Sequence, residues 1–333
     1  MEGLSIIIPF YNVEKYIEAC LQSVVNSMDK LSNVQIILVD DGSKDSSGQI
    51  AKRFVKQYSN ITYVSKENGG LSDARNYGLR YVKYNYVTFI DSDDYIAEDY
   101  FFEIFKAIQS KPDLIVFDWV DVGEKNYRNI VNGMELPNVL WTIQPSAWNK
   151  VYRKNLFDEV LFPKGKIYED VGTTYKLLYY VNDFVYLKKP LYMYRKNRVG
   201  SILTTISPKI NDIYHVLEDT YSFYKEKEAL SVKNTKGLCY QYVKILLWSN
   251  MYRQLKLYKF NLVGFHMKMK QTRSLIYDLF PEWKSNTYIN EKEDFFKERL
   301  GRDFVGKVDK IGKSFIETTA VIFFLILKNR KRY

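Results

Sequence analysis

Short apolar runs alternate with amphipathic segments through the first 95 residues, and this alternation limits the possible folds more than any other feature. It is typical of β-strands that helices connect into a parallel sheet. We predict strands at Leu4–Pro9, Ile36–Asp40, Ile61–Val64 and Tyr86–Asp91, and helices at Tyr11–Ser27, from Asp45 or Ser46 to Tyr58, and from an N-cap at Ser72 to Tyr81. Ligands bind at the carboxyl ends of the strands in open α/β sheets.

The rest of the chain divides into a mixed part and a helical part. Residues 97–207 combine predicted helices at Asp99–Gln109 and Asp170–Tyr180 with predicted strands at Asp113–Trp119, near Val185 and at Leu191–Tyr194. From about residue 208 the apolar residues recur at helical spacing. We therefore expect three parts, 1–96, 97–207 and 208–333.

Positive charge is concentrated in the C-terminal part. Residues 201–333 hold 24 basic and 14 acidic side chains, which accounts for the whole net charge of +10. Such asymmetry indicates an anionic partner. We expect a membrane surface rather than nucleic acid, because no nucleic-acid-binding motif accompanies the charge. The apolar run Ala320–Leu327 is shorter than the roughly 18 residues that span a bilayer, so it either lies at a lipid interface or packs as a final helix.

Cysteine and histidine are too scarce to build a site. Cys20 and Cys239 each lie in an apolar pattern and should be buried, with neither a disulfide framework nor a thiolate metal site. His215 and His266 are the two histidines, which excludes His-rich metal chemistry. The sequence begins with a strand-like run rather than a signal peptide, so we expect a cytoplasmic protein.

Acidic residues follow two of the predicted strands. In LVDDGSKDSS, Asp40 and Asp41 stand at a strand end, where a carboxylate can accept the imide N–H of uracil and the next helix can bind negative charge. In FIDSDD, alternate side chains of an extended segment point the same way, so Asp91 and Asp93 can address one Mg²⁺ or Mn²⁺ together with substrate phosphates. Each motif alone also fits an ordinary solvated turn.

Four motifs in order carry a family resemblance. SIIIPFYN, LVDDGSKD, ENGGLSDARNYGL and FIDSDD together resemble the family-2 glycosyltransferases over residues 4–96. The resemblance implies a GT-A fold, which is a Rossmann-like α/β fold with a mostly parallel central sheet flanked by helices. Residues 1–96 would be its nucleotide-sugar-binding half, residues 97–207 its acceptor-binding half, and residues 208–333 a basic helical region.

The resemblance also implies roles for residues of the nucleotide site. Asp41 would read the uracil and Tyr11 would pack near the base. The remaining assignments are Glu14 and Asp91 around the ribose, Asn68 and Arg75 in the base pocket, Pro9 and Ser92 at the nucleotide, and Asp93 on the metal ion, Mn²⁺ or Mg²⁺. The planar donors of Arg75 suit a base carbonyl or an acidic partner, and an ion pair with Asp73 or Asp41 is the structural alternative.

The resemblance is thinner beyond residue 96. WNKVYRKNLF looks like the acceptor-side segment of the family, and IYEDVGTTYKLL looks like the motif that supplies the catalytic base. Asp170 would be that base, at a helix start where the dipole favours the ionised form, with Glu169 orienting it or touching the acceptor. A plain helix N-cap is the alternative for Asp170. MYRKNRVGSI resembles a basic loop over the diphosphate, with Arg195, Arg198 and Ser201 as candidates.

These motifs imply an inverting transfer of a sugar from a UDP-sugar to a hydroxyl of a saccharide acceptor, lipid-linked or free, in surface polysaccharide assembly. The Gln-x-x-Arg-Trp motif of processive polymerases is missing, which favours addition of one or a few sugars. A non-catalytic nucleotide-sugar-binding subunit is one alternative. A nucleotidyltransferase is another, although PFYNVEK stands where its Gly-rich phosphate loop would be. We expect a peripheral location at the inner face of the plasma membrane, and the helical region could form a homodimer.

Overall fold

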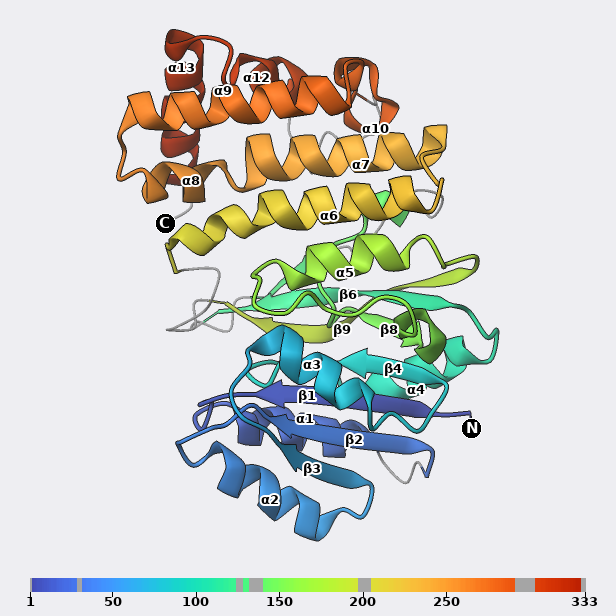
Figure 1. The fold of residues 1–333 in the computed structure, drawn as a ribbon. Coiled ribbons are helices and arrows are strands. Elements are labelled where there is room, and N and C mark those ends of the chain that lie inside the picture. The colour runs from blue at the N-terminus through green and yellow to red at the C-terminus, as the bar shows by residue number, and fades with distance from the viewer. Residues whose placement is uncertain are drawn as a thin grey trace. The chain divides into compact units, whose positions relative to one another are not determined.

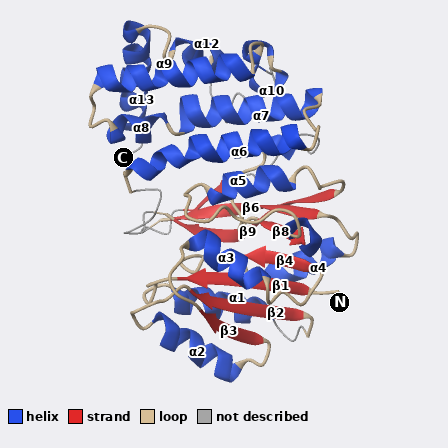
Figure 2. Cartoon of the chain, viewed as in Figure 1, coloured by secondary structure: helices blue, strands red, loops and turns tan. Residues whose placement is uncertain are grey.

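The computed structural model describes residues 2–28, 32–123, 128–131, 140–196, 205–290 and 303–330. The chain forms two compact units, Met1–Leu203 and Thr204–Tyr333. Figure 2 shows that, within the described residues, all strands belong to the first unit and the second unit is helical.

A mixed sheet runs through the first unit (Figure 1). Its described strands follow the order β3-β2-β1-β4-β8-β6-β9-β5, with β7 on β6. The first four in sequence are parallel neighbours, as predicted, and they are β1 (Leu4–Phe10), β2 (Val34–Asp40), β3 (Ile61–Ser65) and β4 (Tyr86–Phe89). The others are β5 (Tyr95–Ile96), β6 (Leu114–Val122), β7 (Arg128–Val131), β8 (Lys150–Arg153) and β9 (Phe184–Arg195).

Helices cover both faces of this sheet. Figure 1 shows α3 (Leu71–Leu79) across one face and α1 (Ile17–Met28) with α4 (Tyr100–Ile108) on the other. The remaining helices are α2 (Ser47–Gln57) and α5 (Glu169–Leu177). Because the strand–helix alternation continues through 4–96 and mixed pairing follows it, the unit has the α/β GT-A architecture that the sequence predicts.

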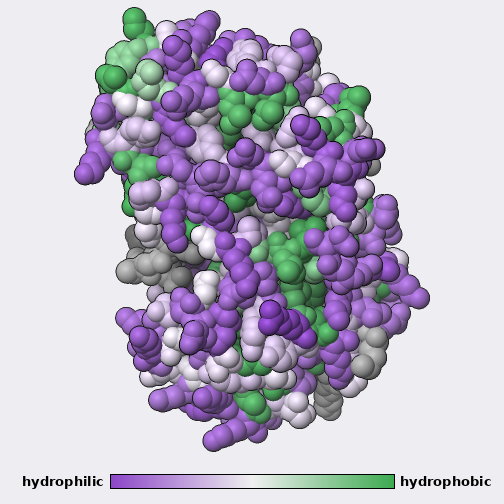
Figure 3. All heavy atoms as spheres, in the orientation of Figure 1, coloured by the Kyte–Doolittle hydropathy of each residue, from purple (hydrophilic) through white to green (hydrophobic). Residues whose placement is uncertain are grey.

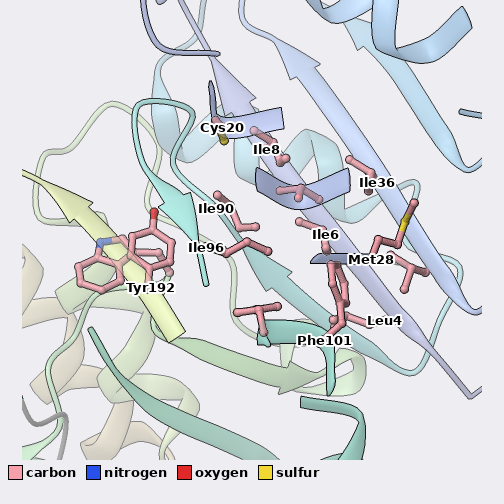
Figure 4. Close-up of a cluster of buried hydrophobic side chains, with 14 of the residues drawn as sticks. Leu4, Ile6, Ile8, Cys20, Met28, Ile36, Ile90, Ile96, Phe101 and Tyr192 are labelled. Atoms are coloured by element: carbon pink, nitrogen blue, oxygen red, sulfur yellow. The ribbon is translucent and has the colours of Figure 1, made fainter. Parts of the chain in front are cut away.

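Apolar side chains of the first strands and helices form one continuous core. Figure 4 shows Leu4, Ile6 and Ile8 of β1 packed with Ile36 of β2 and with Met28 of α1. All of these side chains are at most 6% exposed. Burial of alternating strand residues together with one face of α1 fixes the register of the parallel strands. The predicted burial of both cysteines is confirmed, and neither Cys20 nor Cys239 forms a disulfide.

Two predicted helix boundaries are wrong. The helix predicted from Tyr11 begins only at Ile17, because the N–H of Val13 is bound by Ser47 Oγ and Asn12 has a left-handed backbone. Ser72 is not an N-cap: Gly70, with φ of 85°, precedes the first helical residue of α3, and Ser72 is buried inside it.

The predicted strands near Val185 and at Leu191–Tyr194 are one strand, β9. Its pairing with β6 is irregular around Phe117 and Asp118, where the register shifts twice. Strands β5, β7 and β8 escaped prediction because two to four residues are too few to show a period of two.

The second unit is a set of helices, as predicted for residues beyond 208. They are α6 (Asp212–Glu226), α7 (Val232–Lys244), a π-helical turn at Ile245–Ser249, α8 (Met251–Leu257), α9 (Leu262–Leu279), α10 (Thr287–Asn290), α12 (Phe304–Lys310) and α13 (Phe315–Arg330). Among the described residues, no helix is both long and apolar enough to cross a bilayer.

Candidate active site

Asp41 lies at the end of β2 and is bound on several sides. Its carboxylate accepts hydrogen bonds from Lys66 Nζ at 2.8 Å, from the Gly69 N–H at 3.0 Å and from the Gly70 N–H at 2.7 Å, and it is only 3% exposed. A carboxylate offers about four lone-pair sites, so roughly one stays open for a donor such as a uracil imide. Asn68 supports the same turn by donating to the Asp41 carbonyl at 2.9 Å.

Three other residues predicted to bind the nucleotide lie near the ends of β1 and β2. Tyr11 directly follows β1 and is 44% exposed, so its ring is accessible to a base. Glu14 already accepts a hydrogen bond from the Ser46 N–H at 3.0 Å, which ties the segment after β1 to the start of α2. Pro9 is buried within β1, beside Val39 of β2, and its place at the nucleotide stays a prediction.

Arg75 is the centre of a buried charge cluster. Its Nη2 donates to Asp91 Oδ1 at 2.8 Å, and its Nη1 donates to Asp170 Oδ1 at 2.6 Å and Glu169 Oε1 at 3.1 Å. The Arg75 side chain is only 1% exposed. The predicted alternative, an ion pair with Asp73 or Asp41, is wrong, because Lys66 pairs with both of those carboxylates. Arg75 instead joins the end of β4 to the start of α5.

Burial, and after it the charges of neighbouring carboxylates, raise the pKa values of the two acidic groups that begin α5. The pKa of Glu169 rises to about 7, mainly through burial and then through the charge of Asp170, while Arg75 opposes the shift. The pKa of Asp170 also rises, mainly through burial; Arg75, the Ala147 N–H and Lys150 lower it. The helix start therefore does not by itself keep Asp170 ionised. Nor is Asp170 an N-cap, since the residue that precedes α5 is Tyr168, in a left-handed conformation.

The acidic turn after β4, residues 91–94, accumulates negative charge. Ser92 is buried, and Asp94 is 2% exposed. Burial and then the charges of Asp93 and Asp91 raise the pKa of Asp94 well above its usual range. Asp94 accepts hydrogen bonds from Tyr192 Oη at 2.9 Å and from the Arg195 N–H at 2.7 Å, which fixes the turn against β9.

Arg195, a predicted diphosphate-binding residue, lies beside this turn. Its Nε donates to the Asp93 carbonyl at 2.8 Å, and its guanidinium lies over the rings of Tyr16 and Tyr95 at 5.3 and 5.5 Å. These contacts hold a positive charge next to the predicted metal ligand. Arg198 and Ser201, the other two diphosphate candidates, lie outside the described residues.

The turn suits a divalent cation whose shell a substrate completes. Asp91 and Asp93 add to the negative potential that raises the pKa of buried Asp94, and a cation would relieve that repulsion. In the described part of the chain no three His, Cys, Asp or Glu side chains are grouped as a metal site. Mg²⁺ and Mn²⁺ need only one or two carboxylates when phosphates and water supply the other ligands.

Comparison with known proteins identifies the architecture around this site. Residues 5–167 match the model of Glycosyl transferase family 2. GlyG, a glycosyltransferase of Streptococcus pneumoniae, is 30% identical over 225 residues, which cover 61% of this chain and 74% of GlyG. This chain belongs to glycosyltransferase family 2.

Other similar proteins extend the comparison. The glycosyltransferase GlyA of S. pneumoniae is 35% identical over 221 residues, covering 60% of this chain and 31% of GlyA, so the chain spans about a third of that relative. The minor teichoic acid biosynthesis protein GgaB of Bacillus subtilis is 31% identical over 59% of this chain and 23% of GgaB. The crystal structure of S. aureus TarS 1–349 with UDP superposes with a TM-score of 0.67 at 20% identity, covering 95% of this chain and 91% of that one, and it supports the fold.

Sequence reasoning missed three residues that build the family 2 site here. Asp94 is the last acidic residue of FIDSDD. The presence of a third carboxylate within four residues indicates that one of the three has a structural role. Lys66 and Tyr192 had no signal of their own, because their roles depend on contacts with Asp41 and Asp94 across the sheet.

Proposed function

We propose that this chain is an inverting glycosyltransferase that moves a sugar from a UDP-sugar to a hydroxyl of a saccharide acceptor. The Arg75 cluster is the observation that carries the proposal. In this cluster Arg75 binds Asp91, which belongs to the predicted nucleotide-sugar-binding half, and also Glu169 and Asp170, which belong to the predicted acceptor-binding half. A nucleotidyltransferase or a binding subunit would not need a partly exposed carboxylate held next to the donor site.

Asp170 acts as the general base in this proposal. Its side chain is 21% exposed, so an acceptor hydroxyl can reach it, whereas Glu169 beside it is 12% exposed and more deeply placed. Hydrogen bonds from Arg75 and from the Ala147 N–H stabilise the ionised form of Asp170. Asp170 then accepts the hydroxyl proton as the oxygen attacks the anomeric carbon from the face opposite the diphosphate, which inverts that centre.

Asp93 and Arg195 act on the leaving diphosphate. Negative charge develops on the leaving oxygens as the anomeric bond breaks. A divalent cation held by Asp93 would supply electrostatic stabilisation of that charge. Arg195, fixed by Asp94 and the Asp93 carbonyl, adds a second positive charge from the opposite strand.

A donor screen tests this function. Purified protein with Mn²⁺ is mixed with a panel of nucleotide sugars, and thermal shift and released nucleoside diphosphate are measured. We expect stabilisation by one UDP-sugar, with slow hydrolysis that EDTA or Asp93→Ala reduces at least about 100-fold, and no effect of Asp99→Ala at the nearby surface. Hydrolysis that survives thorough chelation would contradict the metal role. Binding without hydrolysis or transfer would favour the binding-subunit alternative.

The second unit favours an anionic membrane surface as a partner, with a lipid-linked saccharide as the acceptor and a location at the inner face of the plasma membrane. Figure 3 shows hydrophobic atoms at the corner of this unit that carries α13. We call this surface the apolar corner; its exposed side chains are Val263, Met267, Phe315, Ile316, Phe323 and Phe324. His266 of α9 contacts both Phe315 and Thr318, which places the two helices side by side.

Charge and exposure at the apolar corner both fit a lipid interface. Ile316 is 80% exposed, and Lys307 lies 4.9 Å from the ring of Phe324. Val321 and Ile322 are buried, so one side of α13 packs against protein while another side stays open. The burial of Val321 and Ile322 fits the packing alternative for Ala320–Leu327, and the lipid interface stays a prediction. The side chains beyond Phe324 lie outside the described residues. Each basic side chain near anionic lipid contributes about 1 kcal/mol to the free energy of membrane binding. Apolar side chains that insert into the lipid strengthen the binding further.

Vesicle flotation tests the membrane partner. We expect the protein to float with vesicles that contain phosphatidylglycerol and not with pure phosphatidylcholine, and the double variant Ile316→Ser/Phe323→Ser to bind about tenfold less. Val232→Ser, equally exposed on α7, is the matched control. Unchanged flotation of the double variant would remove the apolar corner from membrane binding. A variant that only loses dimers in sedimentation would assign the corner to self-association instead.

A further inference from the structure

Lys150 of β8 is a buried lysine that has no role in the mechanism proposed above. Its side chain is 0% exposed. Its Nζ donates to the Ser146 carbonyl at 2.7 Å, to Asn149 Oδ1 at 2.6 Å and to the Gln144 carbonyl. Removing an ammonium group from water costs several kcal/mol, so apolar packing alone would favour another residue at this position.

These bonds close the segment 144–149 into a fixed shape. Thr174 of α5 donates to the Pro145 carbonyl at 2.6 Å, which ties the segment to the helix that carries the base. Tyr152, which lies in β8, donates a hydrogen bond from its Oη to the Ala147 carbonyl at 3.4 Å. As a result the Ala147 N–H meets Asp170 Oδ2 at 3.2 Å, on the oxygen that Arg75 does not bind.

The charge of Lys150 also balances the Arg75 cluster. With Asp91, Glu169 and Asp170 all ionised, one arginine leaves this cluster with an excess of two negative charges. Lys150 is bound to the Ser146 carbonyl in the segment whose Ala147 N–H binds Asp170, and its charge lowers the pKa of that carboxyl. Like charges in a buried site otherwise favour protonation of one member.

We propose that Lys150 is a positioning residue for the general base: it holds segment 144–149 so that the Ala147 N–H binds Asp170, and it places a buried positive charge behind that segment. This inference rests on the proposed function, in which Asp170 is the base. Lys150 itself touches neither donor nor acceptor in this assignment.

Steady-state transfer and UDP binding, measured across pH on Lys150→Gln and Lys150→Arg, test the role. Lys150→Gln keeps hydrogen-bond donors but loses the charge. We expect its kcat to fall about 10- to 100-fold with unchanged donor KM and UDP affinity, and the acid limb of its kcat profile to move to higher pH. Lys150→Arg keeps the charge and should recover part of kcat and the wild-type acid limb. Lys188→Gln, at an exposed lysine of β9, is the matched control.

Two further variants keep the test decisive. Thr174→Val removes the bond to Pro145 with little change of shape and should lower kcat several-fold without changing UDP affinity, even if Lys150→Gln does not fold. A wild-type kcat and acid limb in Lys150→Gln, or in Thr174→Val when only that variant folds, would overturn the inference while Asp170→Asn stays inactive. An active Asp170→Asn would instead refute the proposed base and leave Lys150 without this role.

Discussion

Asp170→Asn is expected to lower sugar transfer about 10²- to 10⁴-fold while leaving UDP affinity unchanged. The amide keeps the size of the side chain and can still accept from Arg75, but it cannot take the proton of the acceptor hydroxyl. Because the loss concerns the chemical step, it should appear in kcat rather than in the donor KM. Initial rates with a transferred sugar, paired with calorimetric titration of UDP, provide the measurement.

Two variants separate the base from ordinary effects of charge removal. Asp158→Asn, at an exposed acid before α5, should transfer sugar at the wild-type rate. Glu169→Gln should lose less activity than Asp170→Asn, because Glu169 orients the site without taking the proton. If instead Asp170→Asn stayed active and Glu169→Gln were inactive, the base would be Glu169, whose pKa of about 7 would suit that task.

Arg75→Met should lower both the free energy of unfolding and the activity more than any other variant considered. Three carboxylates depend on this 1% exposed guanidinium, and removal of one partner from a buried ion pair typically costs about 3–5 kcal/mol. Methionine fills similar space, so the loss reports the charge rather than a cavity. Urea denaturation followed by circular dichroism measures it. Arg80→Met, at the exposed end of α3, should change stability by less than about 0.5 kcal/mol.

The pH dependence of this loss has a definite sign. The pKa of Glu169 is about 7 in the folded wild type against 4.5 for the free group, and without Arg75 it rises further. A raised carboxyl pKa means that the folded state holds the proton more tightly, so this group favours folding most below pH 4.5 and loses that contribution as pH rises through 7. Arg75→Met should therefore be closest to wild-type stability in acid and furthest from it at neutral pH. A loss independent of pH would show that packing, and not charge, dominates at Arg75.

Local pattern was enough to predict the first four strands and the three helices between them. Each parallel strand is fully or partly buried and long enough for a continuous apolar run, as in β1 and β2. The helix starts were less predictable, because distant side chains decide them: Ser47 Oγ binds the N–H of Val13 and delays α1. Strand β8 could not be predicted, because only its pairing with β4 and β6 makes four residues into a strand.

The site shows the same division between local and distant information. The acidic motifs at Asp41 and Asp91 could be found from their strand ends. What those acids bind in the folded chain could not be predicted, since Lys66 and Tyr192 reach them from other elements. Sequence separation between Arg75 and Asp170 is 95 residues, and no spacing rule connects them.

The contact between β9 and the acidic turn affects which chimeras of such enzymes should be active. Tyr192 Oη accepts from the Asp91 N–H at 3.1 Å, and Asp94 binds the Arg195 N–H 101 residues further along the chain. A hybrid gene that joins residues 1–96 of this protein to the remainder of a relative would thus pair the acidic turn with a foreign β9. Exchange of only the residues between β6 and segment 144–149 would leave both ends of that contact intact, together with the segment that binds Asp170. Crossovers of the second kind should give active chimeras more often, because they keep the acidic turn paired with its own β9.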